Sequence, residues 1–297
     1  MDGVLVVDKP EGPTSHDVVT WCRRRLGAGA VGHTGTLDPM ATGVLVLVLG
    51  KATRLARFLS GQSKAYDATI RLGVSTDTWD RTGAAIGPAY GGPWPSRAAV
   101  EAGLSGLAGQ RAQMPPPFSA KKIDGERAHR LARRGEAVAI EPATVRLHAC
   151  EVVEFEPPVL RVRLDCSAGF YVRSLAQELG ERLGCGACLE RLCRTASGAF
   201  TLAEAADLAA LDADPAAARA RLVPLERLLP EFPAVSLDEA GARRAAHGNE
   251  VAAPGGPAGS LPAGADLVRL MGPDGRLVAI ARAADRPGFL HPAVVLQ

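Results

Sequence analysis

The sequence is poor in aromatic residues, in lysine and in long hydrophobic runs. Phe, Trp and Tyr make up 4% of the 297 residues, and five of the 34 basic residues are lysines. The longest aliphatic run, residues 44–49, is far shorter than a membrane-spanning helix. The first residues also lack the basic start and apolar stretch of a signal peptide. We therefore expect a cytoplasmic protein without membrane segments.

The net charge is also small, and by itself it does not indicate a nucleic-acid-binding protein. The formal value is +2 at pH 7, but the charges are unevenly distributed. Residues 111–135 contain seven Lys or Arg residues and only two acidic residues, so this segment is locally basic. Six cysteines in a chain of this length, without an export signal, are expected to be reduced thiols.

Two short motifs match known patterns, but not in the context that those patterns require. Residues 27–32 (GAGAVG) fit the dinucleotide pattern G-x-G-x-x-G, yet a predicted helix precedes them where a strand is needed. Cys185 and Cys188 are spaced as in zinc and redox motifs, but no second ligand pair accompanies them and they follow a predicted helix. We expect neither a nucleotide site nor a metal site, and we expect both cysteines to be buried and inert.

The hydrophobic pattern predicts strands and helices up to about residue 230 and a different texture after it. Thr14 and Asp17 form a capping-box pattern that opens a helix ending at Gly27. The other predicted elements are strands at residues 4–7, 44–49, 64–73 and 160–168, helices at 172–183 and 203–229, and loops at 83–97 and at the start of the basic segment. Residues 234–297 hold short apolar segments separated by Gly and Pro, which is typical of a small β-barrel.

One glycine-rich loop carries the strongest candidate for chemistry. Residues 32–43 (GHTGTLDPMATG) place Asp38 just before a buried strand, where a rigid scaffold can present a reactive group. An Asp-Pro pair is also common in turns and helix caps, so the loop alone leaves both interpretations open. Arg173 lies at the start of a predicted helix, where a cation is unfavourable, and we expect a carboxylate or a bound phosphate beside it. Tyr66 is either an ordinary core residue or a ring that borders a cleft.

The loop at residues 32–43 resembles the catalytic loop of the TruB family, bacterial tRNA pseudouridine synthases that act on uridine 55 of the T-loop. Further motifs match this family in the same order along most of the chain. They are residues 6–15 (VVDKPEGPTS), 64–66 (KAY), 72–73 (LG), 76–80 (TDTWD), 115–122 (PPPFSAKK), 125–127 (GER), 169–175 (GFYVRSL) and 192–195 (LCRT).

The resemblance implies a mixed α+β fold with two domains. Residues 1–230 would form the pseudouridine synthase catalytic domain, with a large mixed, mostly antiparallel β-sheet flanked by helices. A basic thumb-like insertion would lie at about residues 111–140. Residues 234–297 would form a small β-rich, PUA-like RNA-binding domain. A monomer without an obligate protein partner is expected.

The resemblance also implies the chemistry. Converting uridine to pseudouridine breaks the C1′–N1 bond, turns the uracil and rejoins it through C5, so no redox step is involved and no cofactor or metal is expected. Asp38 is the expected nucleophile, or the base at the sugar. Arg173 is expected to keep Asp38 ionised and oriented through a bidentate ion pair. Tyr66 is expected to stack on the uracil and to assist proton removal from C5. Tyr171 and Leu192 are expected to wall the pocket.

The expected partner is the T-loop and T-stem of tRNA. A base in a folded loop must leave its stack to reach such a pocket, and His33 is expected to occupy the space that it vacates. Lys9 and the basic segment 111–135 are expected to bind phosphates, which positions the RNA without specifying its sequence.

Two other functions remain open at this point. The chain could be an RNA-binding or RNA-folding module without catalysis, although Asp38, Tyr66 and Arg173 are all present. It could also be a glycosidase-like hydrolase, which needs a second carboxylate. Asp77 and Asp80 are the candidates for that carboxylate, and nothing in the sequence places either one near Asp38.

Overall fold

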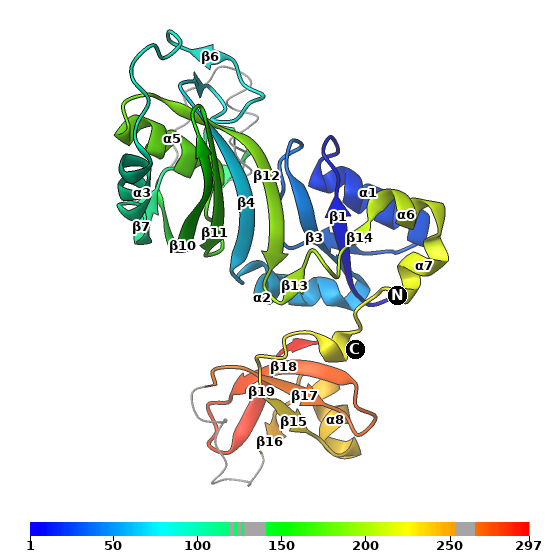
Figure 1. Cartoon of the computed structure of the whole chain (residues 1–297). Coiled ribbons are helices and arrows are strands. Elements are labelled where there is room, and N and C mark those ends of the chain that lie inside the picture. Colours follow the sequence, from blue (N-terminus) through cyan, green and yellow to red (C-terminus); the bar gives the residue numbers. More distant parts are fainter. Residues whose placement is uncertain (119–121, 124–125, 128–140, 254–264, 297) are drawn as a thin grey trace.

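The structure is a computed structural model that describes residues 1–118, 122–123, 126–127, 141–253 and 265–296. Two large β-sheets, one above the other in Figure 1, form its framework. Most of the basic segment expected to project from the catalytic domain lies outside the described residues, so its thumb-like shape stays a prediction. Two small two-stranded sheets complete the strand inventory of the described chain, β5 (Ser75–Thr76) with β6 (Ala85–Ile86) and β8 (Lys122–Ile123) with β9 (Glu126–Arg127).

The larger sheet has ten strands and mixes parallel and antiparallel pairs. Its strands are β1 (Gly3–Lys9), β2 (Val31–His33), β3 (Thr42–Leu49), β4 (Lys64–Leu72), β7 (Gly109–Gln113), β10 (Ala143–Glu156), β11 (Val159–Cys166), β12 (Ala187–Ser197), β13 (Phe200–Thr201) and β14 (Ala206–Asp207). The main order is β14-β1-β3-β12-β4-β11-β10-β7, with β2 beside β3 and β13 beside β12. The β1–β14 and β3–β12 pairs are parallel and the other pairs are antiparallel, as expected for a mostly antiparallel sheet.

Helices lie against both faces of this sheet. They are α1 (Ser15–Leu26), η1 (Gly50–Leu55), α2 (Ala56–Ser60), α3 (Arg97–Ser105), α5 (Val172–Arg182), α6 (Leu208–Ala213), α7 (Pro215–Ala220) and η2 (Leu225–Arg227). Residues of α1, α3 and α5 share a hydrophobic core with Leu5 and Leu45, whereas η1 and α2 pack with Val4 and Val44. Because successive residues of a strand point to opposite faces, these two cores lie on opposite sides of the sheet.

Local sequence signals explain where the elements near the site begin and end. Thr14 caps α1 in a complete capping box with Asp17, and Gly27 ends the helix in the left-handed conformation with φ 66°. Every residue of β3 after Thr42 is buried, as the continuous apolar run predicts. The chain leaves β11, turns at Gly169 and enters α5. Arg173 is the second residue of α5, so this order of elements brings it back over the sheet.

The C-terminal sheet is formed by β15 (Ala234–Ser236), β16 (Val251–Ala252), β17 (Val268–Met271), β18 (Leu277–Ala283) and β19 (Phe289–Val295), with α8 (Glu239–Ala246) against it. It confirms the strands expected from the short apolar segments of this region. Leu277, Ile280 and Leu296 belong to the hydrophobic core that also holds Val4 and Leu55. The two sheets are therefore joined by a shared apolar contact and not by a bare linker.

Three sequence predictions need correction. Residues 203–229 do not form a continuous helix. Helix α6 ends before Asp214, Pro215 begins α7, and the two-residue strand β14 precedes both helices. The loop at residues 83–97 contains the two-residue strand β6. The basic segment does not begin as a loop: Arg111 lies in β7 and pairs with Glu178 of α5.

Candidate active site

The loop between β2 and β3 carries Asp38 and is held from two sides. On one side, Ser15, the first residue of α1, accepts a hydrogen bond from the Leu37 amide (2.8 Å) and donates one to the Leu37 carbonyl (3.1 Å). On the other side, Arg194 of β12 donates to the carbonyls of Gly35 (3.0 Å) and Val44 (2.7 Å), residues that bracket the loop. The loop is therefore fixed to a helix and to the centre of the sheet, so Asp38 is presented on a rigid support.

Gly43 explains why this loop is glycine-rich at its end. Its φ is 98°, in a region that side chains other than glycine rarely adopt. A Cβ built on Gly43 would lie 2.3 Å from the carbonyl oxygen of Arg194, because β3 pairs in parallel with β12 at this position. Any larger residue at position 43 would push these two strands apart.

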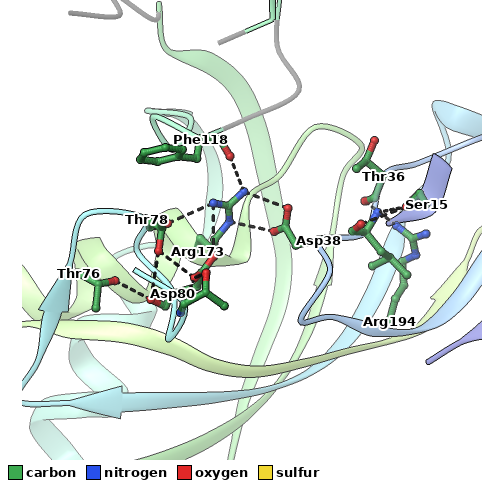
Figure 2. A network of polar contacts seen from close by, with 11 residues as sticks. Ser15, Thr36, Asp38, Thr76, Thr78, Asp80, Phe118, Arg173 and Arg194 are labelled. Carbon is green, nitrogen blue, oxygen red and sulfur yellow. Dashed lines mark hydrogen bonds and ion pairs between the residues drawn. The ribbon is translucent and has the colours of Figure 1, made fainter. Parts of the chain in front are cut away.

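Arg173 reaches Asp38 from α5 and forms an ion pair with both carboxylate oxygens (Figure 2). The Nε–Oδ2 distance is 3.0 Å and the Nη2–Oδ1 distance is 3.2 Å. The guanidinium also donates to the carbonyls of Phe118 (2.9 Å) and Thr78 (3.1 Å). Its side chain is 6% exposed, whereas that of Asp38 is 33% exposed. The guanidinium is thus buried and held by hydrogen bonds, whereas the carboxylate is accessible to a ligand.

Asp80 lies beside the same guanidinium, with 3.6 Å between its Oδ2 and Nη1 of Arg173. Its other oxygen accepts hydrogen bonds from the Thr78 hydroxyl (2.8 Å) and from the amide (2.9 Å) and hydroxyl (2.6 Å) of Thr82. The anion expected next to Arg173 is therefore present twice, as Asp38 and Asp80. Asp77, the other carboxylate weighed for a hydrolase, is exposed and accepts a hydrogen bond from the Ala84 amide.

An open cavity of about 230 Å³ lies next to this pair. Tyr66, Tyr171 and Leu192 line it together with Asp38 and Arg173, so five of the seven residues expected at the site share one cavity. The remaining lining residues are Thr34, Gly35, Thr36, Leu37, Ser60, Lys64, Ser167, Gly169, Phe170, Val172 and Arg194. Tyr66 and Leu192 come from the neighbouring strands β4 and β12, and Tyr171 caps α5.

Burial shifts the acid–base properties of two of these groups. Burial raises the pKa of Asp38 above its ordinary value of 3.8, and the positive charge of Arg173 opposes this rise. Burial also raises the pKa of the Tyr66 phenol above 10, while the nearby Arg194 acts in the opposite direction. The tyrosine therefore stays a neutral phenol at physiological pH, which suits a ring that stacks better than it suits a base.

Lys9 is not placed as expected, whereas the expected role of His33 in the RNA stays a prediction. The Lys9 side chain is fully buried, and its Nζ donates to the carbonyls of Pro10 (2.7 Å), Pro13 (2.8 Å) and Pro39 (3.4 Å). This ammonium joins the first turn of the chain to the Asp38 loop, so the expected phosphate contact does not fit its position. His33 ends β2 and is partly buried, and Thr34, the next residue, is the first that lines the cavity.

Lys64 and Arg194 are site residues to which the sequence reasoning assigned no role. Both lie in matched motifs, but Lys and Arg are usually solvent-exposed, and only the fold shows that both are buried beside the cavity. The six cysteines are free thiols, and burial raises the pKa of Cys188 to about 11, which makes it a poor nucleophile. Within the described ranges, no group of three or more His, Cys, Asp or Glu side chains is placed to hold a metal ion. None of the helices described is long and apolar enough to cross a membrane.

Known proteins resemble this chain over its whole length. Residues 23–172 match the model of the TruB family pseudouridylate synthase N-terminal domain, and residues 173–230 match that of the tRNA pseudouridylate synthase B C-terminal domain. The chain is 42% identical to tRNA pseudouridine synthase B of Solibacter usitatus, with 100% of both chains covered. It is 44% identical to the protein of the same name from Thermobifida fusca, over 99% of this chain and 98% of the relative.

Solved structures show the same architecture. A chain in the crystal structure of a Cbf5-Nop10-Gar1 complex matches with a TM-score of 0.76 and 28% identity, over 99% of this chain and 85% of that chain. A chain in an H/ACA RNP bound to a substrate RNA containing 2′-deoxyuridine matches with a TM-score of 0.74 and 25% identity, over the same shares. The α+β fold and the family resemblance are thereby confirmed. The chain belongs to the TruB family of tRNA pseudouridine synthases, which are isomerases that act on RNA.

Proposed function

We propose that the protein converts uridine 55 in the T-loop of tRNA to pseudouridine, with Asp38 as the group that attacks the sugar. The observation that supports this most directly is the two-point ion pair of Asp38 with Arg173 at the wall of a cavity that also contains Tyr66. The ion pair favours the ionised carboxylate and fixes its direction, and the exposed part of Asp38 leaves it accessible to a nucleotide.

In the proposed reaction, a carboxylate oxygen of Asp38 bonds to C1′ while the C1′–N1 bond breaks and leaves its electron pair on the uracil. The uracil turns inside the cavity. Its C5 then bonds to C1′ as the ester bond to Asp38 breaks. A base then removes the C5 proton and N1 takes up a proton from solvent, which restores the conjugated ring and completes the isomerisation.

The cavity walls have distinct parts in this scheme. Tyr66 stacks on the uracil, and its raised pKa argues that the phenol is not the main base for the C5 proton. Leu192 and Tyr171 cover the base from other sides and exclude water that would trap the sugar intermediate.

The RNA enters the site with its target base extruded, because a stacked base cannot reach the cavity. We assign His33 the space that the base vacates, on the basis of its place next to the cavity-lining Thr34. We also propose that residues 1–230 form the catalytic domain and residues 234–297 a PUA-like RNA-binding domain. The protein would act in the cytoplasm as a monomer, and its substrate would be the T-loop and T-stem of tRNA.

The decisive experiment compares the wild type with Asp38→Asn on a T-stem-loop RNA, with pseudouridine measured by nuclease digestion and chromatography. Asn keeps the size of the side chain but is not a nucleophile, so we expect no product above background. Asp77→Asn is the matched control, because Asp77 is exposed and an Asn can still accept the hydrogen bond from Ala84. Equal product from wild type and Asp38→Asn would remove the assigned role of Asp38.

The same assay tests the two other functions. A wild type that binds the RNA and forms no pseudouridine would favour a catalytically silent RNA-binding module. Release of free uracil would favour the hydrolase. A hydrolase needs a second carboxylate, and in the described chain Asp80 is the other carboxylate beside Arg173. Because Thr78 and Thr82 already bind one of its oxygens, Asp80 is poorly suited to that role, which disfavours the hydrolase.

A further inference from the structure

Two buried cations line the active-site cavity without a carboxylate partner in the part of the chain that the structure describes. Lys64 opens β4 with 6% of its surface exposed, and Arg194 lies on the adjacent strand β12 with 2% exposed. Arg194 pairs in register with Tyr66, and Lys64 lies two residues before Tyr66 on the same face of its strand. Both charges thus lie beside Tyr66 in the lining of the cavity.

Among the described residues, these cations donate hydrogen bonds only to neutral groups, namely backbone carbonyls and, for Arg194, also the Tyr66 hydroxyl. Lys64 Nζ donates to the carbonyls of Ser60 and Gln62, each at 2.5 Å. Arg194 donates to the Gly35, Thr36 and Val44 carbonyls. Among the residues the structure describes, neither cation forms an ion pair, so their donors are satisfied while their charges are not neutralised.

Such an arrangement destabilises the resting site. Burial, and then the like charge of Arg194, lowers the pKa of Lys64 to about 8. A pair of buried like charges persists in a fold only where something offsets its electrostatic cost. Since the described residues provide no anion for it, a negative charge that develops during the reaction is the natural partner.

The proposed reaction moves a negative charge across the cavity. Before attack, the charge lies on Asp38, which is ion-paired with Arg173 (Figure 2). When Asp38 forms the bond to C1′, its carboxylate becomes a neutral ester and Arg173 keeps Asp80 as its anionic neighbour. The electron pair of the broken C1′–N1 bond stays on the uracil, which becomes the anion, so the total charge is conserved.

We propose that Lys64 and Arg194 stabilise the departing uracil anion, and that Lys64 is an electrostatic residue of the reaction in addition to Asp38, Tyr66 and Arg173. This inference rests on the proposed function. Preorganised charges directed at the place where charge develops lower the barrier to the chemical step more than they improve substrate binding. Lys64 is the better test of the two cations, because Arg194 also holds the Asp38 loop.

The test compares Lys64→Gln with Lys64→Arg. Glutamine keeps donors for the Ser60 and Gln62 carbonyls but is neutral, whereas arginine keeps the charge. We expect the single-turnover rate constant of Lys64→Gln to fall about 10- to 100-fold with little change in the Kd for T-stem-loop RNA, and Lys64→Arg to recover most of the rate. Thermal unfolding of both variants shows whether the fold is intact.

A pH profile separates charge from structure. Lys64 faces Arg194 from β12 and Cys166 from β11, with Tyr66 on its own strand. We expect the wild-type rate to fall as the pH rises through about 8, and the Lys64→Arg rate to fall less, because a guanidinium stays protonated there.

The outcomes distinguish this inference from the proposed function. A wild type that forms no pseudouridine overturns both. With an active wild type, a Lys64→Gln rate equal to that of the wild type overturns the inference alone. Equal losses in Lys64→Gln and Lys64→Arg do the same, because a structural role would then explain the loss. A change confined to the Kd would assign Lys64 to phosphate binding and would also overturn the inference.

Discussion

At the scale of single residues, Arg173 is the side chain with the most demanding geometry. Its planar group binds both oxygens of Asp38 and two carbonyls, and it lies beside Asp80. Lysine carries the same charge but lacks the planar guanidinium that can bind both carboxylate oxygens at once. We therefore expect Arg173→Lys to lower kcat about 100-fold or more. Arg25→Lys is the control, since Arg25 forms an exposed ion pair with Asp212. Retention of kcat in Arg173→Lys would show that charge alone is sufficient.

The proposed role of Asp38 predicts the acid side of the pH profile. In that role its carboxylate acts in the ionised form, and burial raises its pKa above 3.8 against the influence of Arg173. Activity therefore falls as the pH decreases through this raised pKa, and we expect the acid limb of kcat/KM at a higher pH than an ordinary aspartate would give. Circular dichroism over the same range checks that the fold persists. An acid limb at or below 3.8 in a folded protein would contradict the assignment.

At the scale of elements, the parallel contact between β3 and β12 is a point where the backbone tolerates only glycine. In Gly43→Ala the new methyl group meets the Arg194 carbonyl at a positive φ, so we expect a loss of about 1–3 kcal/mol in stability together with a loss of activity. Gly29→Ala is the control, because Gly29 is exposed and no atom lies within 4 Å of its added Cβ. Denaturant unfolding compares the two, and equal stabilities would contradict the argument.

Elements with local signals could be predicted from the sequence. The Thr14 capping box, the apolar run of β3 and the alternation in β4 are each encoded within about ten residues, and the structure confirms them. The site could be predicted only through the family resemblance, because Asp38 and Arg173 are separated by 135 positions.

The errors also have a physical cause. Lysines are normally exposed, and the three carbonyls around the Lys9 ammonium include that of Pro39, which lies 30 residues further along the chain. The prolines at 115–117 predict a loop at the start of the basic segment, whereas pairing of β7 with β10 and an ion pair to Glu178 place Arg111 in the sheet. Neither contact leaves a local sequence pattern.

At the scale of the whole molecule, the two sheets share a hydrophobic core. Leu277, Ile280 and Leu296 pack in the cluster that contains Val4 and Leu55, and Arg54 donates to the Val295 carbonyl at 2.7 Å. We expect a chain that ends at residue 230 to have a lower Tm and to aggregate, because it exposes this apolar surface. Arg276→Ala, at an exposed position of the C-terminal part, should leave the Tm unchanged. An unchanged Tm in the truncated chain would show that the sheets are stable independently.

The long separation between Asp38 and its guanidinium partner also bears on the synthesis of the protein. The carboxylate leaves the ribosome early, but α5 and β12 emerge only after more than half of the chain has been made. Until then the Asp38 loop lacks both Arg173 and the Arg194 clamp. In the proposed mechanism, a nascent chain therefore cannot cleave the C1′–N1 bond of an RNA until α5 and β12 have joined the sheet.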